Sequence, residues 1–420
     1  MRGTMELDDE EVMQTLQESG LRTWIGVIAG FRFAQQPRFK GTLKGRIYWW
    51  YEILTDLSVA INGISQFAAL LTPEFRMIDR CLMCFPAASC LLCLFMSNYP
   101  RFKRKNFRSL VEEYENSFSD SQYRHHLEEQ IRKGAKHTRS VIMCLVLLEF
   151  ISMFIFCLIL PVLNEATGFA FGPRRLAVPS LWLWDPLAGF WNYMAVVFVQ
   201  LCGSVFVSLK KIGFLESFFV YASRQICMFT HLRYNLGKIT DPLIVNDDGK
   251  VDVKEFTGSN RYLMKRKLIG WVKNHQNCLR LFEDLVKLYE WPLLVYFGAT
   301  ILILCTATYV TSDNSIDAQT CVICGVFNLG IFFELLFICR TGDRIKHESE
   351  KLLGALNGKN TFLLKSDEYK YLKMILTRCQ SESVINASGG FPLTITTFIA
   401  IIKSSYSYYT LLKKVNGQTD

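Results

Sequence analysis

The sequence lacks the short motifs that identify the common enzyme classes. It contains no glycine-rich phosphate loop, no HExxH zinc motif and no GxSxG nucleophile motif, and its six histidines form no pair with a nucleophile. Charge is scarce too, because 20% of the 420 residues are charged, against about a quarter in soluble domains. We therefore expect neither an enzyme nor a bound cofactor, and the net charge of +9 does not by itself indicate a nucleic-acid partner.

The 14 cysteines give neither a metal site nor a disulfide framework. Three pairs have the CxxC spacing that can bind zinc: Cys81/Cys84, Cys90/Cys93 and Cys321/Cys324. All three lie in or beside apolar segments with no histidine at ligand spacing, so packing explains them better than metal. Asn246–Gly249 lacks the first aspartate of a calcium loop, so we expect a plain turn there. The first 46 residues show no signal-peptide pattern, so we expect no cleaved leader.

Long apolar stretches are what the sequence does contain. Seven stretches of about 20 residues carry almost no charge, which is the length needed to cross about 30 Å of hydrocarbon. They are Ile47–Leu71, Ile78–Ser97, Val141–Leu163, Leu187–Leu209, Trp291–Val310, Thr320–Cys339 and Phe391–Leu412. The expected fold class is an all-α membrane protein with seven transmembrane helices, of which the first is the weakest because it contains Glu52 and Asp56.

Lysine and arginine are distributed unevenly between the two faces of this topology. Forty of the 47 fall in the segments 1–46, 98–140, 210–290 and 340–390, and five fall in the connections of the opposite face. Cytoplasmic segments carry the excess of Lys and Arg in membrane proteins. The N-terminus is therefore expected in the cytoplasm and the C-terminus outside.

Several cytoplasmic segments show helical periodicity of their own. Between 271 and 289, apolar residues such as Trp271, Leu281 and Leu285 recur at three- and four-residue intervals, which predicts an amphipathic helix that runs into the fifth span. We expect a cytoplasmic helical anchor bundle, in which such faces pack against each other or against the same helices of a neighbouring subunit. For 271–289 and 365–383 we expect subunit contacts, because an isolated subunit would expose these faces. The segment 238–260 is expected to be a loop.

The expected organisation follows the chain in seven parts. It consists of a cytoplasmic N-terminal segment (1–46), transmembrane helices one to four (47–209), a cytoplasmic loop with anchor helices (210–290), transmembrane helices five and six (291–339), further anchor helices (340–390), a seventh transmembrane helix (391–412) and an extracellular tail (413–420).

Ionisable residues inside predicted spans are costly in lipid, at about 2.5–3.5 kcal/mol each at the midplane, so they usually face protein or water. Glu149, Glu334 and Lys403 are in this position, and whether they pair with one another or line water is left open. Lys403 is followed by a run of serines and tyrosines in the seventh span. That span is either a buried helix with satisfied hydroxyls or the wall of a water-filled pathway.

The C-terminal helix carries a family resemblance. The segment FPLTITTFIAIIKSSYSYYTLL, residues 391–412, closely resembles the C-terminal signature of insect odorant receptors, and WVKNHQNCLRLFE, from Trp271, resembles the segment that leads into their fifth span. The resemblance implies an odorant-gated, non-selective cation channel in the plasma membrane of olfactory dendrites. It also implies a heterotetramer of an odorant-tuned subunit, which this chain resembles, with co-receptor subunits.

Three alternatives are weighed against this interpretation. A gustatory-type channel of the same superfamily would end in a Thr-Tyr…Gln-Phe pattern, which is missing. A G-protein-coupled receptor would need the opposite orientation and the Asp-Arg-Tyr and Asn-Pro-x-x-Tyr motifs, and the chain has neither. A transporter would show internal repeats or paired broken helices, and none is found.

The resemblance places an odorant pocket among spans two, three, four and six, in the outer half of the membrane. The residues so placed are Cys81, Cys84, Phe85, Phe150, Met153, Phe154, Cys157, Tyr193, Met194, Val197, Leu201, Cys324 and Phe327. Such a lining suits a small, mostly apolar volatile with one or two hydrogen bonds. Alternatively, these residues only pack the helices together.

The resemblance also places a gate at the outer end of the seventh span. Aligned by Tyr408 and Tyr409, Leu411 and Val415 fall at the positions where the family closes its pore with aliphatic side chains, and they lie four residues apart on one helix face. Lys414 falls where the co-receptor carries a neutral amide. The other interpretation is that Lys413 and Lys414 extend to the lipid headgroups.

Overall fold

The computed structural model describes most of the helical part of the chain. The described residues are 43–72, 77–119, 124–154, 176, 180–185, 187–240, 243–245, 251–253, 258–312, 318–356, 373, 375–380, 382–388 and 390–416. Residues 180–185 and 187–189 are not helical, and the helix that follows them begins at residue 190.

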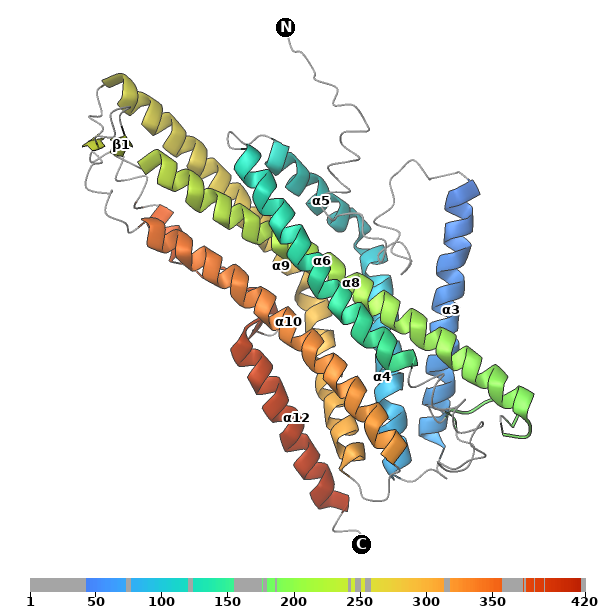
Figure 1. Cartoon of the computed structure of the whole chain (residues 1–420). Helices are drawn as coiled ribbons and strands as arrows, with labels where there is room; N and C mark the ends of the chain where they lie inside the picture. The colour runs from blue at the N-terminus through green and yellow to red at the C-terminus, as the bar shows by residue number, and fades with distance from the viewer. Residues whose placement is uncertain are drawn as a thin grey trace.

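Helices make up almost all of the described structure (Figure 1). They are α3 (Leu43–Leu71), α4 (Met77–Phe102), α5 (Arg104–Ser119), α6 (Arg124–Phe154), α8 (Phe190–Thr240), α9 (Gly258–Thr311), α10 (Ala318–Leu356) and α12 (Ile395–Asn416). Two small antiparallel pairs accompany them: β1 (Leu243–Val245) with β2 (Val251–Val253), and β3 (Asn386–Ala387) with β4 (Phe391–Pro392).

Five of the described helices contain a stretch that is long and apolar enough to cross a membrane, namely α3, α4, α8, α9 and α10. These helices contain predicted spans one, two, four, five and six. The predicted third span begins inside α6 and continues past Phe154, outside the described residues. The predicted seventh span coincides with α12 except at its start, where Phe391 and Pro392 lie in β4 instead.

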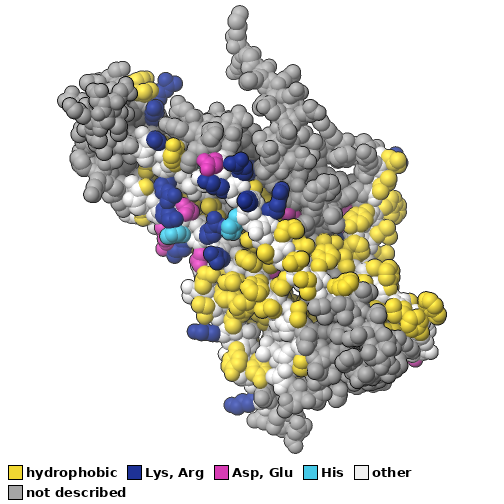
Figure 2. Space-filling view, viewed as in Figure 1, with side chains coloured by type: hydrophobic (Ala, Val, Ile, Leu, Met, Phe, Trp, Pro, Cys, Tyr) yellow, Lys and Arg dark blue, Asp and Glu magenta, His cyan; other side chains and the backbone are white. Residues whose placement is uncertain are grey.

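The outer surface of the bundle supports a membrane environment. Large apolar side chains are exposed along α3, among them Ile47, Trp50, Leu54 and Leu57. Figure 2 shows a band of hydrophobic side chains across the molecule. Soluble proteins rarely expose an apolar surface of this extent, so this face is suited to lipid.

Two helices continue far beyond their apolar stretches. Helix α8 has 51 residues and α9 has 54, so α9 is about 80 Å long at 1.5 Å per residue, well over the thickness of a bilayer. The prediction that the amphipathic segment at 271–289 runs into the fifth span is confirmed, because α9 is continuous from Gly258. Between α8 and α9, where a loop is predicted at 238–260, the chain forms the β1–β2 pair, and the turn at 246–250 lies outside the described residues.

A large aromatic core surrounds Tyr289 of α9. The centroid of its ring lies 5.8 Å from the ring centroid of Phe107 in α5. The ring centroids of Phe214 and Phe218 in α8 lie 5.5 Å and 5.3 Å away, respectively. The Tyr289 hydroxyl also lies 2.8 Å from the Ser217 hydroxyl. Aromatic contacts of this kind add about 0.5–1.5 kcal/mol each beyond the burial of area. Helices α5, α8 and α9 of one chain therefore share a single core.

This core corrects one expectation from the sequence. The apolar face of 271–289 was expected to form subunit contacts because an isolated subunit would expose it. Instead, Leu281 and Leu285 are 0% exposed in the single chain, and Trp271 is buried as well. The indole nitrogen of Trp271 donates to the carbonyl oxygen of Leu232 in α8 at 2.8 Å. The periodicity correctly indicated burial, but the partner is the same chain.

Candidate functional site

One apolar cluster gathers side chains from four helices. Cys81 and Phe85 of α4 and Cys324 of α10 are buried in it, and the Phe327 ring of α10 lies 5.0 Å from Phe85. Its α9 members are Ile303, Leu304, Tyr309 and Val310. Ile402 and Tyr409 of α12 pack against its edge.

The structure thus brings together four of the thirteen residues expected to line the ligand site. The sequence analysis did not predict the α9 members of this cluster. The resemblance placed the pocket among four other spans, and the residues at 303–310 show no pattern that separates cluster residues from other apolar residues of the helix. Residue Cys84 is half-buried, one helical turn from Cys81 on the same helix.

The α8 residues expected in the site lie elsewhere. Tyr193 and Val197 are buried, and Met194 and Leu201 are half-buried, but among the described residues none of them joins the cluster around Phe85. Nearby, Asn62 of α3 donates to the carbonyl oxygen of Val199 at 3.1 Å, so α8 and α3 are in contact at this level of the bundle.

The α6 residues face outward. Phe150 and Phe154 are 40% and 56% exposed, respectively, in the single chain. Residue Cys157 and the side chain of Met153 lie outside what the structure describes. Of the four residues expected from the predicted third span, Phe150 and Phe154 are therefore on the surface rather than in the apolar cluster.

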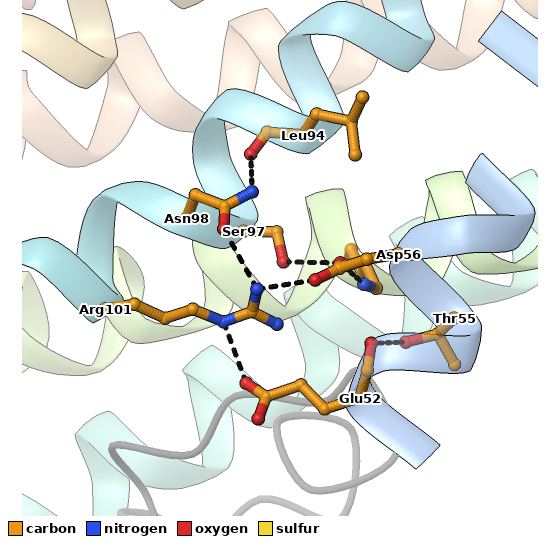
Figure 3. Close-up of polar contacts among 8 residues, drawn as sticks. Glu52, Thr55, Asp56, Leu94, Ser97, Asn98 and Arg101 are labelled. Carbon is orange, nitrogen blue, oxygen red and sulfur yellow. Dashed lines mark hydrogen bonds and ion pairs between the residues drawn. The ribbon is translucent and has the colours of Figure 1, made fainter. Parts of the chain in front are cut away.

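Acidic residues in the predicted first span are paired across helices (Figure 3). Arg101 of α4 donates from Nε to Glu52 Oε1 at 2.8 Å, and it also forms an ion pair with Asp56 of α3. Asn98 Oδ1 accepts from the same guanidinium at 2.9 Å. Asp56 forms a second ion pair with Lys210 of α8, whose side chain is 1% exposed. The two carboxylates that made the first span look weak are thus neutralised by α4 and α8.

A second buried network answers the question left open for the span glutamates. Lys211 of α8 lies 2.6 Å from Glu149 Oε1 of α6 and 3.0 Å from Glu334 Oε1 of α10. Ser208 donates to Glu149 at 2.9 Å, and Tyr296 of α9 donates to Glu334 at 3.1 Å. The two glutamates therefore share one partner, Lys211. The sequence analysis had assigned Lys211 to the cytoplasmic segment 210–290, so it did not consider this lysine as a partner for charges inside the spans.

Lys403 takes no part in this network and is exposed on α12. That helix has two different faces: Phe398 and Ile401 are buried, while Tyr406, Tyr408 and Leu411 are exposed, Leu411 by 57%. Lys414 is exposed too, and the side chain of Val415 is outside the described set.

The start of α12 is held by α10. The Asp343 carboxylate accepts a hydrogen bond from the Ile395 backbone nitrogen at 2.9 Å, and the Thr394 hydroxyl accepts one from the Thr397 nitrogen at 3.3 Å. Both bonds satisfy amides that a helix N-terminus leaves without partners. Beside Asp343, a Cβ on Gly342 would lie 2.2 Å from the Leu393 carbonyl oxygen, so the two backbones touch here.

The fold and the site define a helical membrane protein in which a buried apolar cluster packs against the C-terminal helix. Residues 77–406 match the family described as 7tm Odorant receptor. The chain therefore belongs to the insect odorant receptor family, whose members are receptors rather than enzymes.

Relatives and solved structures agree with this membership. The chain is 24% identical to odorant receptor 67c of Drosophila melanogaster over 49% of its own length and 47% of that protein, and 24% identical to odorant receptor 10 of Aedes albopictus over 36% and 40%. The matched region thus spans less than half the length of these relatives. The structure of the olfactory receptor OR5 from Machilis hrabei in complex with eugenol matches with a TM-score of 0.76 over 97% of this chain and 100% of that one. At 14% identity, this likeness shows the fold.

Proposed function

We propose that this chain is the odorant-tuned subunit of a ligand-gated, non-selective cation channel in the plasma membrane of olfactory neurons. A small, mostly apolar volatile binds in the outer half of the bundle and opens a central pore. Co-receptor subunits of the same family complete the heterotetramer, with membrane lipid around it. The family membership supports odorant binding, and the four-helix cluster supports the route from ligand to pore.

The cluster is the observation that carries this proposal. Phe85 and Phe327 belong to the expected ligand site, and the same cluster packs against Ile402 and Tyr409 of α12. A volatile that separated Phe85 from Phe327 would therefore press on the helix expected to line the pore without any intervening element. Dispersion and shape complementarity would hold such a ligand, as in most apolar sites.

The test compares two Phe-to-Ala changes on α4. Phe85→Ala should change the rank order of odorant potencies in a ligand panel, measured as currents in cells that also express the co-receptor. Phe102→Ala, at an 85% exposed position of the same helix, should leave the order unchanged. Phe85→Leu provides a milder version, because Phe→Ala at a buried site costs about 3–5 kcal/mol. If Phe85→Leu alters only the surface expression and never the order of potencies, the ligand site is elsewhere.

The gate is proposed at the outer end of α12, at Leu411, Lys414 and Val415. Four lysines around a narrow cation pore would repel its ions, whereas one lysine among three neutral partners is tolerated. Lys414→Glu in a heteromer should raise permeability to divalent relative to monovalent cations, measured from reversal potentials, with little change in odorant potency. Unchanged reversal potentials would place Lys414 against lipid or a neighbouring helix instead of the pore.

A further inference from the structure

A basic stripe runs along the cytoplasmic part of α6. Arg132, Lys136 and Arg139 are all exposed and recur at spacings of four and three residues, so they share one face of the helix. Arg139 lies two residues before Val141, where the predicted third span begins. The stripe therefore ends at the expected surface of the membrane.

Helix α10 adds two arginines beside this stripe. Arg340 and Arg344 are exposed, lie one helical turn apart, and follow directly on Cys339, where the predicted sixth span ends. The guanidinium of Arg344 lies 3.4 Å and 3.5 Å from the two ring nitrogens of His137 on α6, so the two helices bring their cations together. In Figure 2, Lys and Arg side chains gather above the hydrophobic band on the face that α6 and α10 present.

These five cations are not neutralised by the described part of the chain. Among the residues that the structure describes, no carboxylate lies within 4.0 Å of Arg132, Lys136, Arg139, Arg340 or Arg344. The exposed lysine between them, Lys133, does have such a partner, Glu129 at 2.6 Å. Partial burial lowers the pKa of His137, and the positive charges of Arg344 and Arg340 lower it further.

The same face of α6 becomes apolar where the basic stripe ends. Met143 and Leu147 continue the spacing from Arg139 and are 56% and 62% exposed. A ligand that covers the whole face must therefore carry negative charge at one end and hydrocarbon at the other. This combination is the chemistry of an anionic phospholipid in the cytoplasmic leaflet, not of a soluble anion.

We propose that the α6–α10 face binds an anionic phospholipid with a multiply charged headgroup. The headgroup phosphates contact Lys136, Arg139, Arg340 and Arg344, and an acyl chain lies along Met143 and Leu147. A headgroup with several phosphates fits better than one with a single net charge, because five cations at the surface lack a partner among the described carboxylates. Clusters of four to eight Lys and Arg next to a membrane span attract such lipids with about 1 kcal/mol for each cation.

The experiment uses the full chain in nanodiscs of phosphatidylcholine. A fluorescent phosphatidylinositol bisphosphate is added at fixed ionic strength, and its binding is followed by anisotropy, with phosphatidylserine as the singly charged comparison. We expect tighter binding of the bisphosphate lipid. Loss of two cations in Arg340→Gln/Arg344→Gln should weaken it by about 30-fold.

Two variants make the result specific. Arg280→Gln/Lys287→Gln removes the same charge from exposed positions on α9, each with its own acidic partner, and should change binding little. Lys136→Gln/Arg139→Gln should weaken binding like the α10 pair, and all variants must keep the elution volume and thermal unfolding of the parent. Equal weakening by the α9 pair, or equal binding of phosphatidylserine and the bisphosphate lipid, would overturn the site and leave only general charge attraction.

Discussion

Lys210 and Lys211 are consecutive in α8, yet their ammonium groups join different helices. Lys210 pairs with Asp56 of α3, and Lys211 pairs with Glu149 of α6 and Glu334 of α10. Both lysine side chains are almost fully buried, where an unpaired charge would be very costly. The two residues therefore connect α8 to three other helices, α3, α6 and α10.

Lys211 offers the sharpest test at the residue scale. Lys211→Met would leave two buried carboxylates without a cation, and breaking a buried ion pair in this way costs about 3–5 kcal/mol. We expect little folded receptor, measured by size-exclusion profile and thermal unfolding in detergent. Adding Glu149→Gln and Glu334→Gln makes the network neutral and should recover part of the loss.

An exposed pair supplies the matched control. Lys133→Met removes the partner of Glu129 one helical turn away, and such surface pairs contribute about 0.3–0.5 kcal/mol. Its unfolding temperature should match that of the parent. A Lys211→Met protein as stable as Lys133→Met would mean that the glutamates are not ionised in the folded protein.

At the scale of elements, the junction between α10 and α12 is the tightest described contact near the expected pore. Gly342 lets the Leu393 backbone approach, and Asp343 caps the first turn of α12. We therefore expect a displacement of α10 to reach the start of α12 through this backbone contact and the charge-assisted hydrogen bond.

Two glycines of α10 test this junction. Gly342→Ala places a methyl group 2.2 Å from the Leu393 carbonyl oxygen, which a side-chain rotation cannot relieve. It should displace the start of α12, lower the unfolding temperature and shift the odorant dose–response curve. Gly354→Ala meets nothing within 4 Å and should be neutral or slightly stabilising, because alanine favours helix over glycine by about 1 kcal/mol. Identical behaviour of the two variants would rule out a tight junction.

The sequence predicts the existence of these elements better than their ends. Apolar length located α3, α4 and α10, and periodicity located the amphipathic part of α9. It did not predict that Phe391 and Pro392 form a strand, since this depends on pairing with Asn386 and Ala387. It also did not predict α8 as one continuous helix, because the buried face around Phe214 and Phe218 exists only once α9 is packed against it.

At the scale of the whole molecule, α5, α8 and α9 form a core within the single chain. Leu281→Asp would place a charge in that core, with an expected cost of more than about 4 kcal/mol. We expect the variant to misfold even when expressed alone, as judged by fluorescence-detected size exclusion. Leu263→Asp makes the same change at an exposed position of α9 and should fold normally. A folded but unassembled Leu281→Asp chain would restore this face as a subunit contact.

The candidate site shows what a single sequence can and cannot specify. Resemblance placed Phe85 and Phe327 in the same site, and they do contact each other. The Phe150–Phe154 spacing looked identical to a pocket stripe, but a helix face that meets lipid is as apolar as one that meets protein. Periodicity tells which residues share a face and leaves the neighbour of that face unspecified, so it could not predict that α9 joins the cluster around Phe85.

The consecutive lysines also restrict how α8 can move. Neighbouring residues on a helix point about 100° apart, so a rotation that brought Lys210 closer to α3 would swing Lys211 away from α6 and α10. The two ion pairs therefore oppose rotation of α8 about its own axis. We therefore expect α8 to respond to a displacement near Tyr193 and Val197 by tilting or by sliding along its axis, and not by rotating about that axis.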